Sequence, residues 1–187
     1  EKCEKERVRL VLDECFVQFL TSGEEASMQL ETGRFRYLFV LQAFTKIYAV
    51  PGIRLGYGIS SDKALLERME TVRQPWSVST PAQAAGLSAL KEDHREEQTR
   101  QLVKSERERM EKELENLRIE YIPSEANFLL FNSEINWFEE LKKRGILIRD
   151  CANYRGLGNG WYRLAVRLPE ENDRLLECMK QVLNERS

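Results

Sequence analysis

The chain has 187 residues, of which 42% are hydrophobic and 32% charged, and its formal net charge is -2 at pH 7. These values are ordinary for a globular protein with one large domain or two small ones, and the charge gives no reason to expect nucleic acid or an anionic membrane as a partner. No apolar run approaches the roughly 20 residues needed to span a bilayer, and no signal-peptide pattern opens the chain.

The cysteines and the histidine exclude several kinds of site. Four cysteines are widely scattered and form no C-x-x-C pair: Cys3, Cys15, Cys151 and Cys178. Their scatter argues against a metal site or a disulfide framework and suits the reducing cytoplasm. The single histidine, His94, lies in the charge run KEDHREEQ, where a solvated helix face is the expected structure. A Ser-His-Asp hydrolase is therefore not indicated.

The first part of the chain alternates strands and helices. Three apolar or β-branched segments are predicted as strands: residues 8–12, 37–41 and 53–59. The first two are expected to be buried. Three segments are predicted as helices: residues 24–30, 62–72 and 80–90. Ser61-Asp62 is an N-cap signal for the second, and Thr80-Pro81 starts the third. We expect an α/β fold with a mostly parallel sheet over residues 1–90.

A different pattern follows. From Asp93 to about Leu117 the sequence predicts a long, highly charged helix, and its weak apolar periodicity is typical of a bridge between domains. Beyond it, four short strands and two helices are predicted: strands at residues 119–123, 127–131, 146–150 and 161–166, and helices at residues 135–144 and 169–184. This pattern indicates a long linking helix and a small α+β domain over residues 91–187.

Asp13 and Lys46 each follow an apolar strand. We therefore expect both at the carboxyl edge of the sheet, where ligands bind in open α/β folds. A lysine with few charged neighbours can act as an amine nucleophile, and a carboxylate can hold a cationic ring nitrogen. Arg54 with Thr45 can hold a phosphate. Pyridoxal phosphate requires these three contacts, although from spacing alone a surface lysine and a paired arginine remain the simpler interpretation.

Several segments together resemble the fold-type I pyridoxal-phosphate enzymes of aminotransferase class I/II: LDECF, AFTKIYAVPGIRLGY, PWSVSTPAQAAGLSAL, EANFLLF, and ILIRDCANYRGL with WYRLAVR. The resemblance runs through the whole chain, and the lysine-to-arginine spacing in TKxYAxPGxRLGY is highly specific. It implies the C-terminal half of such an enzyme, namely the last part of the cofactor-binding large domain and then the small domain. Within the family, the chain is most similar to the threonine-phosphate decarboxylases of cobalamin biosynthesis, with histidinol-phosphate aminotransferases as near relatives.

The resemblance gives four residues a role toward the cofactor, pyridoxal 5'-phosphate. Lys46 matches the catalytic lysine that forms the Schiff base, and Asp13 matches the acid that keeps the pyridine nitrogen protonated. Thr45 and Arg54 match ligands of the cofactor phosphate.

In the small domain, Arg163 matches the arginine that binds the substrate α-carboxylate, and Arg149 matches a second arginine for a substrate anion. Asn127 recurs in the family without an assigned role. Arg167 is expected instead to pair with a surface carboxylate.

Two positions depart from the family pattern. Ala43 stands where Ser or Thr usually adds a phosphate ligand, and the loss of one hydrogen bond to a charged group costs about 1.5–3 kcal/mol. Phe16 stands where aminotransferases commonly have a Tyr that donates to the phenolic oxygen of the cofactor. Phenylalanine at this position is similar to the decarboxylase branch.

The resemblance implies a cytoplasmic enzyme that is a homodimer when intact and acts on a small phosphorylated amino acid or amine. Three functions remain open: L-threonine-O-3-phosphate decarboxylase, a histidinol-phosphate-type aminotransferase, and a truncated remnant without catalysis. The glycine-containing phosphate loop and the aromatic that stacks on the cofactor ring belong to the other half in these enzymes. We therefore expect the chain alone to be inactive or nearly so.

Overall fold

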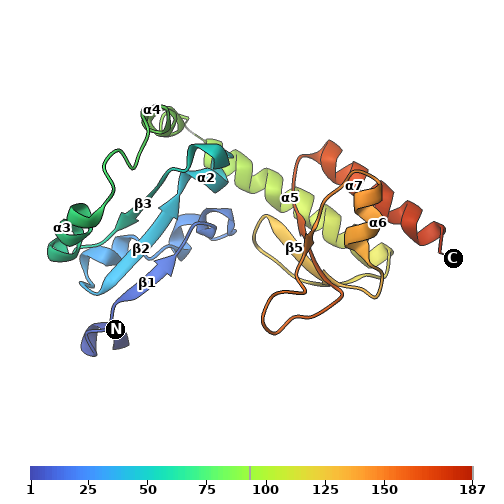
Figure 1. Cartoon of the computed structure of the whole chain (residues 1–187), viewed down its shortest axis with the longest axis horizontal. Coiled ribbons are helices and arrows are strands. Elements are labelled where there is room, and N and C mark those ends of the chain that lie inside the picture. The colour runs from blue at the N-terminus through green and yellow to red at the C-terminus, as the bar shows by residue number, and fades with distance from the viewer. Residues whose placement is uncertain (93, 187) are drawn as a thin grey trace. The chain divides into compact units, whose positions relative to one another are not determined.

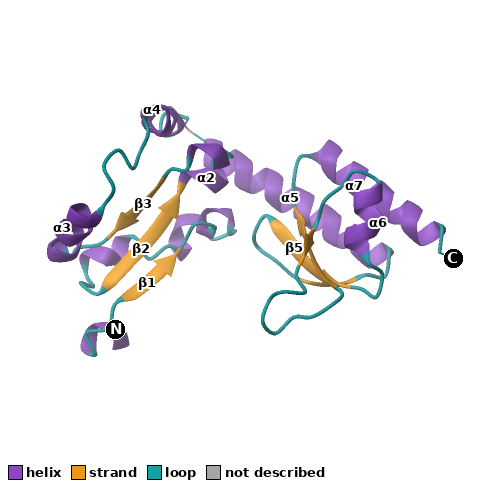
Figure 2. Cartoon of the chain, in the orientation of Figure 1, coloured by secondary structure: helices purple, strands orange, loops and turns teal. Residues whose placement is uncertain are grey.

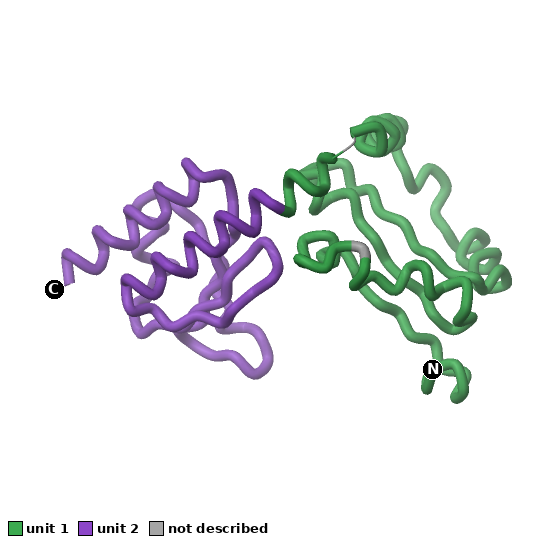
Figure 3. Tube along the Cα trace, turned by 180° about the vertical axis from the view of Figure 1, so that it is seen from behind, with its two compact units in different colours: residues 1–100 green, residues 101–187 purple. Residues whose placement is uncertain are grey.

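The computed structural model describes residues 1–92 and 94–186, and of Glu24 only the backbone. The chain divides into two compact units, Glu1–Arg100 and Gln101–Ser187 (Figure 3). The long helix α5 (Arg95–Asn116) contributes residues to both units, and its predicted start at Asp93 lies outside the described residues. In the ranges described, no helix combines the length and apolar character that a membrane span needs.

The first unit contains a three-stranded sheet in the order β1-β2-β3 (Figure 1). The central strand β2 (Leu38–Ala43) is largely buried and runs parallel to β1 (Leu10–Asp13), with Asp13 opposite Leu41. On its other side β2 pairs antiparallel with β3 (Gly56–Ile59). The carboxyl ends of β1 and β2 therefore lie at one edge of the sheet.

Three local predictions for this unit need correction. The segment predicted as a buried strand over residues 8–12 instead gives an edge strand, β1, in which Leu10 and Val11 are 38% and 53% exposed. Apolar composition predicts a strand, but it does not show whether another element covers it. The helix predicted over residues 24–30 is replaced by separate single turns of 3-10 helix at Gly23–Ala26 and Leu30–Gly33.

The third correction concerns β3, which begins at Gly56 and not at residue 53. Pro51–Ile53 forms a turn of 3-10 helix, and Arg54 adopts a left-handed conformation with φ +57°. The chain makes two further short turns, α1 (Lys2–Lys5) and a 3-10 turn at Val17–Phe19.

Two longer helices follow β3, and their predicted starts are confirmed. The N–H of Leu65 donates to Asp62 Oδ1 at 3.3 Å, which caps α3 (Lys63–Val72). Ser79 caps α4 (Thr80–Ala89) by accepting from the N–H of Ala82 at 3.3 Å, and Pro81 occupies the first turn, where its missing N–H costs nothing.

The second unit contains an antiparallel sheet in the order β4-β5-β7-β6 (Figure 2). Its strands and the two helices that follow α5 have these bounds: β4 (Glu120–Ile122), β5 (Phe128–Asn132), α6 (Trp137–Lys143), β6 (Arg149–Asp150), β7 (Trp161–Ala165) and α7 (Pro169–Asn184). Residues from the sheet and from the helices are fully buried together and form the core of this unit: Leu129, Phe131, Trp137, Leu141, Leu164 and Met179. The strand predicted at residues 146–150 is reduced to two residues, and Leu147 before it is 74% exposed.

Candidate active site

β1 and β2 bring Asp13 and Lys46 to the same edge of the first sheet. Asp13 is the last residue of β1, and Lys46 lies in α2 (Phe44–Ile47), which follows directly on Ala43, the end of β2. Both side chains are exposed. The pKa of the Asp13 carboxyl is lowered, chiefly by hydrogen bonds from the Cys15 thiol and N–H, and further by the positive charge of Lys46. The carboxylate therefore stays ionised next to the amine.

Cys15 is a residue of this site that the sequence analysis did not single out. Its backbone N–H donates to Asp13 Oδ1 at 3.0 Å. Burial raises the pKa of the Cys15 thiol to about 11, and the hydrogen bond to Asp13 adds to the shift, so the thiol stays protonated as a donor to the carboxylate. An aspartate that accepts from the N–H two residues on is a common turn, and this spacing is the signal that could have indicated Cys15.

Phe16 lies against the amine. The Nζ atom of Lys46 is 5.2 Å from the centroid of the Phe16 ring, a cation–π distance. The position at which the family resemblance expects a tyrosine hydroxyl therefore presents an aromatic face to Lys46.

A cleft of about 490 Å³ opens beside Lys46. Thr45, Arg54, Gln42 and Cys15 also line it. Thr45 is buried, whereas Arg54 is exposed and donates through Nη1 to the carbonyl of Pro51 at 3.3 Å. The structure thus places a hydroxyl, an amine and a guanidinium on one cleft.

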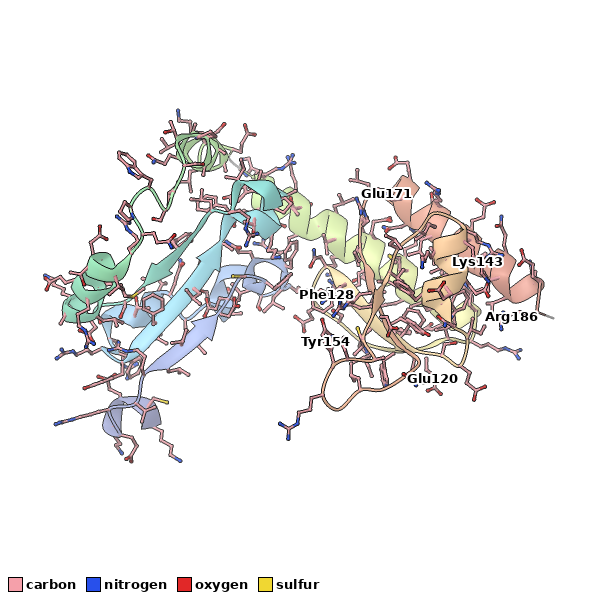
Figure 4. The ribbon with its side chains drawn as sticks, viewed as in Figure 1. Glu120, Phe128, Lys143, Tyr154, Glu171 and Arg186 are labelled. Atoms are coloured by element: carbon pink, nitrogen blue, oxygen red, sulfur yellow. The ribbon has the colours of Figure 1, made fainter. Side chains whose placement is uncertain are left out.

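The second unit brings Arg149 and Arg163 together, directly opposite each other in the antiparallel pair of β6 and β7. Arg149 donates through Nη2 to Asn153 Oδ1 at 3.2 Å, and its guanidinium lies 5.4 Å from the centroid of the Tyr154 ring. The guanidinium of Arg163 lies 5.1 Å from the centroid of the Phe128 ring; Figure 4 labels both aromatic residues.

These two arginines form no ion pair with any carboxylate in the described part of the chain. Like charges directly opposite each other on neighbouring strands destabilise a sheet. An anion bound between Arg149 and Arg163 would remove this cost. Asn153 and Tyr154, which the sequence analysis did not single out, fix the orientation of Arg149.

The two remaining polar candidates of this unit have structural contacts. Arg167 forms an ion pair at 2.8 Å with Glu171, which Figure 4 labels, as predicted. Both side chains are exposed. The backbone carbonyl of Asn127 accepts from Val166 N–H at 2.9 Å and extends the ladder between β5 and β7. Strand alternation therefore directs the Asn127 side chain to the opposite face from Phe128, the ring beside Arg163.

The six predicted residues thus form two clusters: Asp13, Thr45, Lys46 and Arg54 in the first unit, and Arg149 with Arg163 in the second. An α/β unit that presents an amine and an ionised carboxylate at its sheet edge is the kind of framework that group-transfer enzymes with carbonyl cofactors use. Residues 1–178 match the family model described as Aminotransferase class I and II, and the chain belongs to this family.

Named relatives come from two branches. The chain is 36% identical over 187 residues to the threonine-phosphate decarboxylase of Salmonella typhimurium, covering 98% of this chain and 51% of the relative. It is 37% identical over 175 residues to histidinol-phosphate aminotransferase 1 of Archaeoglobus fulgidus, covering 93% and 52%. The chain therefore spans about half the length of these curated relatives.

Comparison with solved structures gives the same family. The crystal structure of the histidinol-phosphate aminotransferase from Clostridium acetobutylicum matches with a TM-score of 0.91 at 30% identity, over 98% of this chain and 57% of that one. The fold class predicted from the sequence, part of an aminotransferase-type α/β fold, is confirmed.

Proposed function

We propose that this chain carries part of the active site of a pyridoxal-phosphate enzyme, and that the intact enzyme is an L-threonine-O-3-phosphate decarboxylase of cobalamin biosynthesis. The observation that supports this most directly is the meeting of Asp13 and Lys46 at one sheet edge, beside the cleft that Thr45 and Arg54 line. This set of groups fits the cofactor: an amine for its aldehyde, a carboxylate kept ionised for its ring nitrogen, and a hydroxyl and guanidinium for its phosphate.

When bound, pyridoxal phosphate supplies an electron sink for the bond that breaks at the substrate Cα. Lys46 Nζ is the nucleophile that attaches the cofactor to the protein. Asp13 would hold the ring nitrogen of the cofactor, and its lowered pKa keeps the carboxylate negatively charged for that purpose. Ala43 has no hydroxyl to offer the cofactor phosphate, so Thr45 and Arg54 are the phosphate ligands that we propose from this chain.

The paired arginines of the second unit suit a substrate with two anionic groups. Arg163, in β7, binds the α-carboxylate, and Arg149, in β6, binds the second anion, which is a phosphate in threonine phosphate. A guanidinium binds either group through two parallel hydrogen bonds, which also fixes the orientation of the substrate.

The decarboxylase branch is favoured by Phe16, because its ring faces Lys46 where the resemblance expects an aminotransferase tyrosine. A histidinol-phosphate-type aminotransferase is the second candidate, since its representatives are as similar to the chain as the decarboxylase is. In that reaction Lys46 would also serve as the group that carries the proton. In either case we propose a cytoplasmic homodimer as the intact enzyme and little or no turnover by this chain alone.

The cofactor assignment is tested by mixing the chain with pyridoxal phosphate, reducing with borohydride, and mapping the modified peptides by mass spectrometry. We expect selective modification of Lys46, and none on that peptide in Lys46→Arg. Lys104 and Lys142, also in the chain, report nonspecific modification. Label spread over such lysines without preference for Lys46 contradicts the proposal.

The branch is tested in a protein that contains this chain and has the length of its relatives. The decarboxylase releases carbon dioxide from threonine phosphate without a second substrate. The aminotransferase instead forms glutamate from 2-oxoglutarate and requires that co-substrate. Glutamate formation without carbon dioxide release would reverse the preference for the decarboxylase.

A further inference from the structure

Glu14 follows Asp13 directly but lies in a different environment. Asp13 is exposed, whereas Glu14 is only 8% exposed. Its backbone N–H donates to the carbonyl of Leu41 at 3.0 Å, so the parallel ladder between β1 and β2 continues one residue beyond Asp13. In the described part of the chain no lysine or arginine forms an ion pair with this carboxylate. A buried carboxylate of this kind needs other donors.

The Glu14 carboxylate receives three neutral hydrogen bonds. Ser27 donates through Oγ to Oε2 at 2.6 Å, and the backbone N–H of Met28 donates to Oε1 at 2.9 Å. Gln42 of β2 donates through Nε2 to Oε2 at 3.1 Å. One carboxylate therefore joins the end of β1, the loop at residues 27–28, and the strand that leads to Lys46.

The contact with Glu14 leaves one polar atom of Gln42 buried and without a partner among the described residues. Its side chain is only 4% exposed, and its Oε1 atom has no hydrogen-bond partner among the described residues. An unsatisfied buried amide oxygen destabilises a fold, and an apolar residue of similar size would avoid that cost. Gln42 also lines the cleft beside Lys46. The polar side chain is therefore best explained by the position it gives to its neighbours.

The hydrogen bond between Glu14 and Gln42 links two short segments of the site. Glu14 is covalently next to Asp13, and Gln42 precedes Ala43 and the helix α2 that holds Lys46. A shift of one strand end along the other would change the separation of the carboxylate and the amine. Misplacement of reacting groups by about 1 Å can cost about 100-fold in rate.

We propose that Glu14 and Gln42 are positioning residues that fix Asp13 and Lys46 relative to each other, so that one cofactor can contact both. This inference rests on the proposed function. It predicts that the hydrogen bond between the two side chains matters more than the identity of the residue that carries the charge.

The test is an exchange of the two side chains. Glu14→Gln removes the charge but keeps a hydrogen bond between two amides. Gln42→Glu places two carboxylates about 3 Å apart, a repulsive arrangement. The double variant Glu14→Gln/Gln42→Glu restores one carboxylate and one amide in reversed order. Glu25→Gln is the matched control, because Glu25 is an exposed carboxylate in the same part of the unit.

The readout is the pH profile of Lys46 modification by pyridoxal phosphate and borohydride, expressed relative to surface lysines in the same sample. We expect Gln42→Glu to lose about tenfold or more in selectivity for Lys46. Glu14→Gln keeps a hydrogen bond between the two side chains and should stay within about threefold of the parent. The exchanged double variant should recover to within about threefold of the parent, since the two sites are directly coupled. Glu25→Gln should not change the profile.

Thermal unfolding of every variant separates positioning from loss of fold, and labelling is done well below each melting temperature. Ser27→Ala, which removes one donor outside both strands, provides a milder variant if a single exchange does not fold. It should lower the selectivity for Lys46 about two- to fivefold.

Two results overturn the inference, and they differ from each other. If the parent labels Lys46 selectively and the folded Gln42→Glu variant does so equally well, the positioning role is wrong while the cofactor site stands. If the parent shows no preference for Lys46, the proposed function itself fails, and the positioning role fails with it.

Discussion

Arg149 and Arg163 lie directly opposite each other in the antiparallel pair of β6 and β7, with no carboxylate paired to either in the described part of the chain. Arg149→Gln or Arg163→Gln removes a like-charge contact, so without an added anion the stability of the second unit should change by no more than about 0.5 kcal/mol. Inorganic phosphate should stabilise the parent by about 1.4 kcal/mol at ten times its dissociation constant, and the variants much less.

Thermal unfolding with and without phosphate measures this difference. Arg155→Gln is the control, because Arg155 is an exposed arginine in the loop between the same two strands. If phosphate stabilises both arginine variants as much as it stabilises the parent, the two residues do not form an anion site.

Asp62 should make the first unit sensitive to acid. Its pKa is lowered chiefly by the hydrogen bond from Arg9, whose Nη2 lies 2.5 Å from Oδ2, and by the N–H of Leu65. A carboxyl whose folded pKa is depressed stabilises the fold above its unfolded pKa of about 3.9, and this contribution is lost as the pH falls through the folded value. Asp62→Asn should therefore destabilise the chain at pH 7, and this difference should shrink at about pH 3 and below.

Urea unfolding at both pH values checks this prediction. Glu70→Gln is a matched control, because Glu70 pairs with Arg73 on the surface of α3 with both side chains more than half exposed. Asparagine still caps α3, so a destabilisation by Asp62→Asn that is equally large at both pH values would show that the hydrogen-bond geometry lost with the carboxylate, and not its charge, carries the effect.

Gly56 permits the close pairing of β3 with β2. A Cβ atom at this position would lie 2.8 Å from the carbonyl oxygen of Gln42, which is part of the backbone and cannot move freely. Gly56→Ala should therefore destabilise the first unit by about 1–3 kcal/mol. It should also reduce the selective modification of Lys46, because the displaced strand lines the same cleft.

Gly52→Ala is the control for this prediction, since a Cβ atom there meets nothing within 4 Å. Its effect on stability should stay within about 0.5 kcal/mol. Equal effects of the two substitutions would mean that the steric contact with Gln42 is unimportant.

Local signals explain which parts of the fold the sequence predicts well. Asp62, Ser79 and Pro81 act within a few residues of the helix starts that they determine, and the bounds of α7 also match the prediction. The burial of β1 was predicted wrongly because exposure depends on what packs against a strand, and the residues of the strand do not contain that information.

The candidate site likewise combines features that the sequence predicts with one that depends on the folded arrangement. Lys46 and Asp13 were predicted from their places after apolar strands, and the parallel pairing of β1 and β2 confirms that they share an edge. The hydrogen bond between Glu14 and Gln42 joins residues 28 positions apart. Neither residue type indicates this contact by itself, so only the folded arrangement reveals it.

Asn172 should be the most sensitive polar residue of the second unit. It is 1% exposed, and its Nδ2 donates to Glu106 Oε2 at 2.7 Å and to the carbonyl of Arg167 at 2.9 Å. Its Oδ1 accepts from the backbone N–H of Arg167 at 3.0 Å. Asn172→Ala leaves the backbone N–H and carbonyl of Arg167 without these partners and takes one of two donors from Glu106 Oε2, so it should lower the free energy of unfolding by about 2–3 kcal/mol.

Asp173→Asn provides the comparison for this variant. Asp173 pairs with Arg109 at 2.6 Å, but its side chain is 64% exposed, and exposed ion pairs contribute no more than about 1 kcal/mol. Urea unfolding of both variants at pH 7 should therefore rank Asn172→Ala well below Asp173→Asn in stability. An equal or reversed ranking would show that Glu106 and the backbone of Arg167 find other partners, since Arg109 already donates to Glu106 at 2.7 Å.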